Sequence, residues 1–194
     1  LESQGAQVLD LEQLASHRGS LLGGLPDVPQ PSQKMFESRL WHNLGKFDTG
    51  QPVHIESESQ RIGILQLPEP LIAGMRQGRC IWLETPREVR VQRLLRDYPH
   101  WTRSGSLDEK LDRLAVLHGR AIIQEWKACA VAGDWGTFVR RLLEEHYDPA
   151  YSKSIASHYP QWAATHRVNI ETGNDAEFGL AAQALLRPTL ALRT

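Results

Sequence analysis

Short apolar runs alternate with longer segments of helical periodicity along this chain. The first run, residues 7–12, ends in the acids Asp10 and Glu12 and predicts a buried strand. Further strands are predicted at residues 53–57, 79–84 and 167–171. Apolar positions three and four residues apart predict helices at residues 32–44, 68–75, 87–98, 107–118, 120–131, 135–146 and 175–186. This order of strands and helices is typical of a doubly wound α/β fold with a parallel sheet.

Glycine, proline and capping residues mark the connections between these elements. Three glycines and two prolines within residues 13–29 predict a loop, which follows one helical turn at residues 11–17. Residues 147–151, which include Pro149, predict a turn. Asp134 is a good N-cap for the helix that follows it.

Composition and charge narrow the class of protein. The chain has 194 residues, of which 41% are hydrophobic and 23% charged, as in soluble globular domains. The net charge of −1 gives no overall field for nucleic acid, so any such contact needs a local patch. Cys80 and Cys129 form no C-x-x-C pair, which favours a reduced, cytoplasmic location and no metal site. No apolar run approaches the roughly 20 residues of a membrane span.

Acidic residues follow two of the predicted strands, where parallel sheets place their ligands. Asp10 and Glu12 end the first predicted strand with the spacing of acids that bind a magnesium ion or a substrate hydroxyl, and the alternative is that Asp10 simply caps the next turn. Glu56 and Glu58 close the second strand, and strand alternation turns both toward one face. Their repulsion would raise one pKa, as acid–base chemistry requires, unless a cation or Arg61 lies between them. The alternative is a salt bridge from these acids to Arg61.

Two polar segments between these strands are candidate anion sites. His17, Arg18, Gly19 and Ser20 lie in the glycine-rich loop, where Arg18 and backbone amides can bind an anion and His17 can carry a proton. A plain surface turn is the alternative. The second segment begins a predicted helix, whose unpaired amides favour negative charge, and consists of Gln30, Pro31, Ser32, Gln33 and Lys34.

Arginines dominate residues 76–103, which contain seven arginines and three acids. Four of them recur every third residue along one side of the predicted helix, namely Arg87, Arg90, Arg93 and Arg96. They could hold a small phosphate ligand, meet an RNA backbone or form a solvated face, and the pattern does not decide among these roles.

The motifs HRGS, QPSQK-x-FE and ESxRIG occur in this order within residues 7–63, and together they resemble the P-loop half of bacterial tRNA 2-selenouridine synthases. The resemblance implies a P-loop kinase-like sheet without its first strand. The family's G-x-x-x-x-G-K-[ST] loop should stand just before Gln7 and is not in the sequence. One incomplete domain over residues 1–194 is expected, made of an α/β part (1–105), a helical segment (106–160) and a final strand and helix (161–194).

The resemblance also implies a reaction: wobble 2-thiouridine of tRNA is S-geranylated by geranyl diphosphate, and selenium from selenophosphate then displaces the geranylthio group. The implied partners are tRNA, a rhodanese-like domain of the same protein and selenophosphate synthetase. Acid–base or magnesium roles are expected for Asp10, His17, Glu56 and Glu58. Phosphate or substrate binding is expected for Arg18, Gly19, Ser20, Gln30, Ser32, Gln33, Lys34, Ser59 and Arg61, and tRNA binding for the four arginines. The alternatives are a P-loop small-molecule kinase and a non-catalytic tRNA-docking module.

Overall fold

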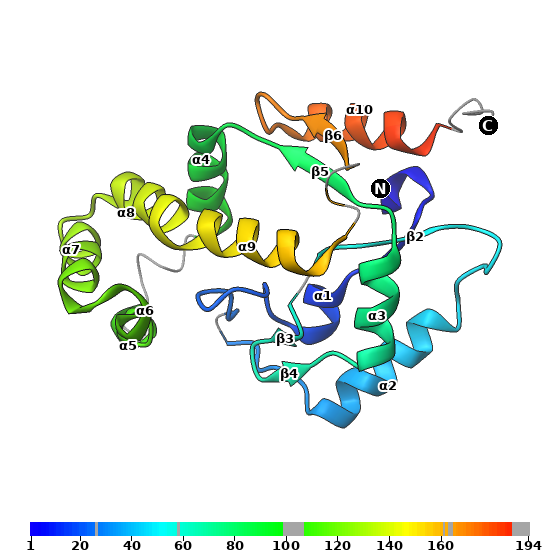
Figure 1. Cartoon of the computed structure of the whole chain (residues 1–194), viewed down its shortest axis with the longest axis horizontal. Coiled ribbons are helices and arrows are strands. Elements are labelled where there is room, and N and C mark those ends of the chain that lie inside the picture. Colours follow the sequence, from blue (N-terminus) through cyan, green and yellow to red (C-terminus); the bar gives the residue numbers. More distant parts are fainter. Residues whose placement is uncertain (26, 58, 99–106, 161, 163–164, 188–194) are drawn as a thin grey trace. The chain divides into compact units, whose positions relative to one another are not determined.

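The fold is described from a computed structural model that covers residues 1–194 apart from 26, 58, 99–106, 161, 163–164 and 188–194 (Figure 1). The chain divides into two compact units. Unit 1 comprises residues 1–75 and 174–194, and unit 2 comprises residues 76–173. Whether both belong to one domain, as the sequence predicts, stays a prediction.

Unit 1 contains two small sheets. Strands β1 (Gln7–Leu9) and β2 (Val53–Ile55) pair in parallel, with Leu9 opposite Ile55. Strands β3 (Arg61–Ile62) and β4 (Leu65–Gln66) form an antiparallel hairpin. The helical elements that begin in this unit are η1 (Glu2–Gln4), α1 (Leu11–Ala15), α2 (Gln33–Leu44), α3 (Glu69–Gln77) and α10 (Asp175–Leu186).

The core of unit 1 joins α1, α2 and the hairpin. Phe36 and Leu40 lie one turn apart on α2, so both side chains reach the same side of that helix and are buried there. They belong to a buried cluster whose other members are Leu9, Leu11, Ala15, Ile62, Leu65, Leu67 and Ile72. This cluster fixes the chain that leaves β1 against the chain that follows β2.

Unit 2 combines one parallel pair with a group of helices. Strands β5 (Ile81–Glu84) and β6 (His166–Asn169) pair in parallel, with Ile81 opposite His166. The helices are α4 (Arg87–Asp97), α5 (Leu107–Asp112), α6 (Ala115–His118), α7 (Arg120–Val131), α8 (Trp135–Leu142), the π-helix η3 (Leu143–Tyr147) and α9 (Asp148–His158). Trp126 of α7 and Phe138 of α8 are fully buried and anchor the packing of these helices.

Several predicted elements are confirmed, with shorter strands than expected. The four predicted strands are present, but β1 ends at Leu9 because the Asp10 side chain already accepts a hydrogen bond from Gln13 N (2.7 Å) and starts α1. The predicted N-cap is also confirmed, since Asp134 accepts a hydrogen bond from Thr137 N (3.1 Å). The coarse α/β class holds as a mixed fold with short parallel strand pairs, and the β3–β4 hairpin was not predicted.

Two predictions about the helical segment are wrong. Residues 147–151 do not form a turn, because η3 continues directly into α9. Pro149 lies in the first turn of α9, where a missing backbone N–H breaks no intrahelical bond. The predicted helix at residues 107–118 is divided into α5 and α6. Among the described helices, none is long and apolar enough to cross a membrane.

Candidate functional site

The carboxyl ends of β1 and β2 bring two acidic side chains to the first turn of α1. Asp10 follows Leu9 and Glu56 follows Ile55, and these two apolar residues are register partners in the parallel ladder. Glu56 Oε1 accepts hydrogen bonds from Leu11 N (2.6 Å) and Glu12 N (3.0 Å), both in α1. The structure therefore places Asp10 and Glu56 together, where the sequence predicted ligand chemistry.

The environment of Glu56 changes its acidity. Burial raises the pKa of the Glu56 carboxyl, and the negative charge of Asp10 nearby raises it further. Hydrogen bonds from backbone N–H groups oppose this rise without cancelling it. A carboxyl with a raised pKa exchanges protons closer to neutral pH, which suits general acid–base work. The sequence predicted such a shift from a second acid, Glu58, which lies outside the described residues, and burial is the larger cause here.

The HRGS loop is closed by backbone bonds. His17 and Gly24 form an antiparallel bridge, Arg18 N donates to Gly23 O (2.9 Å), and Gly23 N donates to Ser20 O (2.8 Å). A side chain at Gly23 would lie 2.8 Å from the carbonyl carbon of Arg18, so only glycine allows this close approach. His17 is 9% exposed, whereas Arg18, Gly19 and Ser20 are partly exposed. The loop thus holds the Arg18 and Ser20 backbone in a fixed turn.

The two glutamines of the QPSQK segment bind backbone rather than project into solvent. Gln30 Nε2 donates to Ile62 O (2.9 Å), and Gln30 Oε1 accepts from Ile64 N (2.9 Å). Gln33 forms the same two kinds of bond with Gln66: its Nε2 donates to Gln66 O (2.8 Å), and its Oε1 accepts from Gln66 N (2.9 Å). Each amide therefore replaces a strand partner and fixes the β3–β4 hairpin. Their predicted role in phosphate or substrate binding is not tested by these contacts and stays a prediction.

The remaining predicted residues of unit 1 are placed as follows. Ser32 caps α2 by accepting from Met35 N (3.3 Å), and Lys34 is exposed in the first turn of that helix. Ser59 Oγ donates to Arg61 O (2.5 Å) and accepts from Arg61 N (3.2 Å). The exposed Arg61 side chain forms no ion pair with Glu56, and the other salt bridge considered from the sequence, to Glu58, lies outside the described residues.

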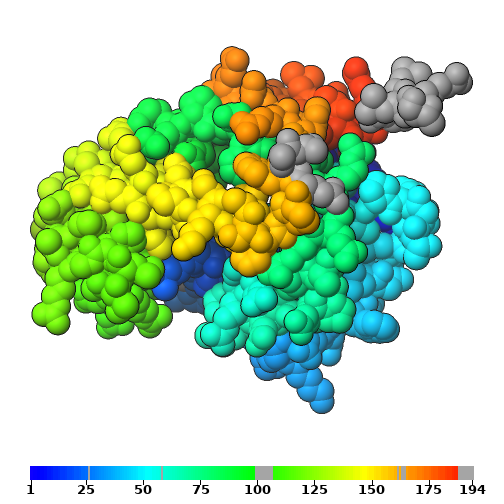
Figure 2. Space-filling model, viewed as in Figure 1, coloured from blue at the N-terminus to red at the C-terminus, as the bar shows by residue number. Residues whose placement is uncertain are grey.

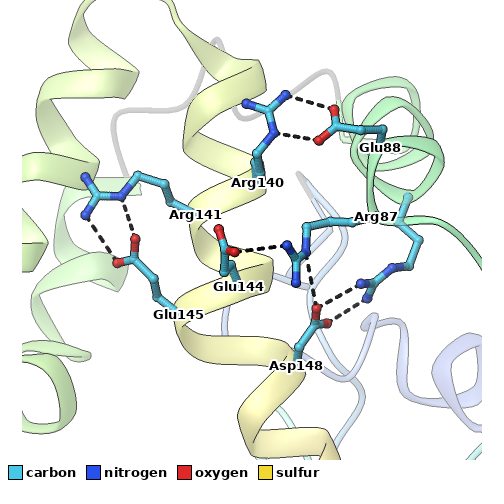
Figure 3. Close-up of polar contacts among 8 residues, drawn as sticks. Arg87, Glu88, Arg140, Arg141, Glu144, Glu145 and Asp148 are labelled. Carbon is cyan, nitrogen blue, oxygen red and sulfur yellow. Dashed lines mark hydrogen bonds and ion pairs between the residues drawn. The ribbon is translucent and has the colours of Figure 1, made fainter.

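Three of the four α4 arginines are engaged within unit 2. Arg87 pairs with Glu144 (3.0 Å) and Asp148 (3.6 Å), and Figure 3 shows these contacts reaching from α4 to the η3 and α9 segment. Arg90 binds both oxygens of Asp148 (2.7 and 2.8 Å). That pairing holds the pKa of the Asp148 carboxyl below its usual range. These contacts connect residues almost 60 positions apart in the sequence.

The other two arginines of α4 differ from each other. Arg93 donates to Gly173 O (3.1 Å) and pairs with Asp97 (3.5 Å). Arg96 is exposed and has no ion pair among the described residues. The acidic partners in residues 144–148 were not predicted from the sequence, although the segment EEHYD is acidic. A turn was expected at residues 147–151, and the helical geometry of the segment was therefore not considered. Binding of tRNA by the four arginines stays a prediction.

Metal binding has limited support in this geometry. Among the residues that the structure describes, no group of three or more His, Cys, Asp or Glu side chains could hold a metal ion. Two carboxylates beside a phosphate ligand can nevertheless suffice for Mg²⁺, which keeps several of its waters. Asp10 and Glu56 are the residues that fit this requirement.

Parallel strand pairs and the helices between them define a mixed α/β fold. Two carboxylates, Asp10 and Glu56, follow the two strands of its first parallel pair. Residues 1–110 match the family model described as the tRNA 2-selenouridine synthase AAA domain, and the chain belongs to this family. The resemblance stated from the sequence is therefore confirmed, and with it the homology to an enzyme of tRNA modification.

Curated relatives support this assignment. A tRNA 2-selenouridine synthase of Nitrosomonas europaea is 41% identical over 99 residues, which are 50% of this chain and 26% of the relative. One from Shewanella piezotolerans is 39% identical over 127 residues, 64% of this chain and 33% of the relative. One from Pseudomonas aeruginosa LESB58 is 32% identical over 214 residues, 93% of this chain and 55% of the relative. The chain thus spans about half or less of these relatives' length, and no solved structure matches it.

Proposed function

We propose that this chain is the part of a tRNA 2-selenouridine synthase that binds the phosphate-bearing donors and the tRNA. In the first step the sulfur of wobble 2-thiouridine attacks geranyl diphosphate, a C–S bond forms and diphosphate leaves. In the second step the selenium of selenophosphate attacks C2 of the base, the C2–S bond breaks and geranylthiol leaves. Water then cleaves the Se–P bond, which releases phosphate and gives 2-selenouridine. The observation that carries the proposal is the pair Asp10 and Glu56 at the carboxyl ends of adjacent parallel strands, within a chain of this family.

Five of the predicted residues receive a role under this proposal. Asp10 and Glu56 would position a proton or a magnesium ion, which would neutralise charge on the diphosphate. The closed HRGS loop would present Arg18 and Ser20 to a phosphate, because its backbone is already fixed by three hydrogen bonds. Lys34 adds an exposed positive charge at the start of α2.

The proposed reaction also needs a further domain and a partner enzyme. A rhodanese-like domain of the same full-length protein would supply the reactive cysteine for the selenium exchange, with selenophosphate synthetase as the source of the donor. Residues 1–194 alone would then bind substrates without completing the reaction. A cytoplasmic location agrees with tRNA as substrate.

The test is a reconstitution with the full-length protein and tRNA that carries wobble 2-thiouridine. Nucleosides are analysed by mass spectrometry after incubation with geranyl diphosphate, and again after selenophosphate is added. We expect geranylthiouridine in the first sample and 2-selenouridine in the second. Turnover of ATP without tRNA would instead support a small-molecule kinase. Binding of tRNA without binding of geranyl diphosphate would support a docking module, and either outcome would overturn the proposal.

We also propose that both parallel pairs belong to one doubly wound P-loop sheet, in which a further strand pairs with β2 on one edge and with β5 on the other. The family match over residues 1–110 supports this topology, as does the parallel pairing of β1 with β2 and of β5 with β6.

This topology predicts that the chain gains stability when it is expressed with the preceding segment of the full-length protein. A central strand adds two ladders, and each backbone group left unpaired in a buried position costs about 1–3 kcal/mol. We expect a higher urea midpoint for the extended protein and slower amide exchange in residues 53–57 and 79–84. Equal midpoints with equal protection of these strands would contradict the P-loop topology.

Two arginines of α4 distinguish a role in tRNA binding from a role in stability, because Arg96 has no ion pair among the described residues and Arg90 is paired with Asp148. Arg96→Gln should weaken tRNA binding and reduce the slope of log affinity against log salt by about 0.7 to 0.9, as expected for one lost phosphate contact. Arg90→Gln should mainly lower the thermal midpoint, because it leaves Asp148 without its bidentate partner. Salt-dependent binding and thermal melting measure the two effects. An unchanged salt slope for Arg96→Gln would exclude this residue from the RNA interface.

A further inference from the structure

The outer face of α2 carries a large aromatic side chain in solvent. Trp41 is 80% exposed, and its indole has no hydrogen bond or ring contact with any residue in the described part of the chain. Phe36 and Leu40 occupy the buried side of the same helix, so Trp41 adds nothing to that core. In Figure 2, the α2 segment lies at the surface in view. The indole is therefore available on the surface of unit 1.

The charges around Trp41 select the kind of ligand. Within residues 33–46 the cationic side chains are Lys34, Arg39 and Lys46, with His42 beside them and Glu37 as the one acid. Lys34 and Lys46 form no ion pair with any described residue. Glu37 lies one helical turn before Trp41 and keeps its negative charge, because the hydrogen bond that it accepts comes from the neutral amide of Gln33 (2.8 Å). The segment still has more cations than acids and is positive, although the whole chain has a net charge of −1.

Helical spacing aligns the aromatic ring with the charge. Lys34 and Trp41 are seven residues apart, so they point within about 20° of each other and lie about 10 Å apart along the axis. Ser38, between them, donates its hydroxyl to Lys34 O (2.9 Å) and leaves a small side chain on this face. A nucleotide stacked on Trp41 would bring a neighbouring phosphate within reach of the Lys34 side chain.

We propose that a surface formed by one side of α2 (Lys34, Ser38, Trp41 and His42) and by Lys46, which follows the helix, binds unpaired nucleotides of the RNA substrate, with one base stacked on Trp41. An aromatic ring combined with cations is the arrangement that single-stranded nucleic acid requires, because every base offers a flat face and every linkage a negative charge. The inference rests on the proposed function only in taking tRNA as the RNA.

The test measures binding of the chain to an RNA hairpin with an unpaired loop and to a blunt RNA duplex, by fluorescence anisotropy at several salt concentrations. We expect the loop to bind more tightly than the duplex. Trp41→Ala should weaken loop binding by about 5- to 150-fold, the range of one lost base–aromatic stack. Trp41→Phe should restore much of this loss. Lys34→Gln should lower the salt slope by about 0.7.

A matched control removes an equally exposed apolar side chain from another element. Leu117 is 70% exposed on α6, and Leu117→Ala should leave the affinity for the loop unchanged. Thermal melting of Trp41→Ala should match the parent chain, because the indole contacts no core residue. Equal affinities of Trp41→Ala and parent, or no binding of the loop at low salt, would overturn the inference. Loss of a dimer in Trp41→Ala would also overturn it and would identify a second copy as the occupant.

This outcome is separable from the proposed function. If the full-length protein forms 2-selenouridine while Trp41→Ala keeps full RNA affinity, only the role of α2 is wrong. If the full-length protein forms neither modified nucleoside, the proposed reaction is wrong whatever α2 binds.

Discussion

Glu56→Gln in the full-length protein should reduce formation of 2-selenouridine at least about 100-fold, the lower range for loss of a general acid or base. The amide keeps an oxygen that can accept from Leu11 N and Glu12 N, so the first turn of α1 should remain in place. It removes the charge and the titratable proton. Mass spectrometry of tRNA nucleosides measures the result, and normal selenouridine content would exclude Glu56 from the reaction.

The same variant should not lose stability at neutral pH. Because the pKa of Glu56 is raised in the folded state, the folded protein holds this proton more tightly than the unfolded chain does. Ionisation of Glu56 therefore lowers the free energy of unfolding as pH rises above the unfolded value of about 4.3. Glu56→Gln removes that penalty, so its thermal midpoint should equal or exceed the parent's at pH 7, and the gain should disappear below about pH 4.

Glu69→Gln is the matched control, since Glu69 is an exposed acid in the first turn of α3. It should change neither the nucleoside content nor the pH dependence of melting. A lower midpoint for Glu56→Gln at pH 7 would mean that the charge itself stabilises α1, and the inferred direction of the pKa shift would be wrong.

Gly63→Ala should destabilise unit 1 by about 3 kcal/mol, a large part of the roughly 5–15 kcal/mol that holds a domain together. Gly63 has φ +60°, where a side chain is strained. A Cβ there would also lie 2.7 Å from Gln30 Cδ and 2.9 Å from His17 Cδ2. Gln30 would have to move and would lose its bonds to Ile62 O and Ile64 N. Urea unfolding measures the loss.

Gly133→Ala is the control that distinguishes backbone strain at a positive φ from the steric collision of a new Cβ. Gly133 also has a positive φ, +73°, but a Cβ at that position would meet nothing within 4 Å. This variant should therefore show only the backbone strain, about 1–2 kcal/mol. In a Gln30→Ala background, Gly63→Ala should cost less than in the parent, because one of the two colliding side chains is gone and only His17 Cδ2 stays close. If Gly63→Ala costs no more than Gly133→Ala in the parent, the contact with Gln30 is unimportant.

The elements of this chain follow from local patterns, and the sequence predicts most of them. The start of α2 at Ser32 and the start of α8 at Asp134 depend on hydrogen bonds within three residues, which spacing alone reveals. The turn expected at residues 147–151 was wrong for the same local reason. Pro149 predicts a break in helical structure, but η3 leads directly into α9. Pro149 lies in the first turn of α9, where proline is tolerated.

The partners of the polar side chains were harder to predict, because they depend on distant contacts. Asp10 and Glu56 could be placed together, since the ends of adjacent parallel strands meet by topology. The bonds from Gln30 and Gln33 to the hairpin could not, because no sequence pattern marks a residue about 33 positions away as a backbone partner. The pairing of Arg90 with Asp148 crosses 58 positions and was hidden for the same reason.

Gln30 and Gln33 make the β3–β4 hairpin sensitive to deamidation. Each amide donates through its nitrogen to a backbone carbonyl and accepts through its oxygen from a backbone N–H. Deamidation of either residue to glutamate would place a carboxylate oxygen against the carbonyl oxygen of Ile62 or Gln66, with no proton between them. One slow hydrolysis would thereby release β3 from the loop that precedes α2, or β4 from the first turn of α2 itself.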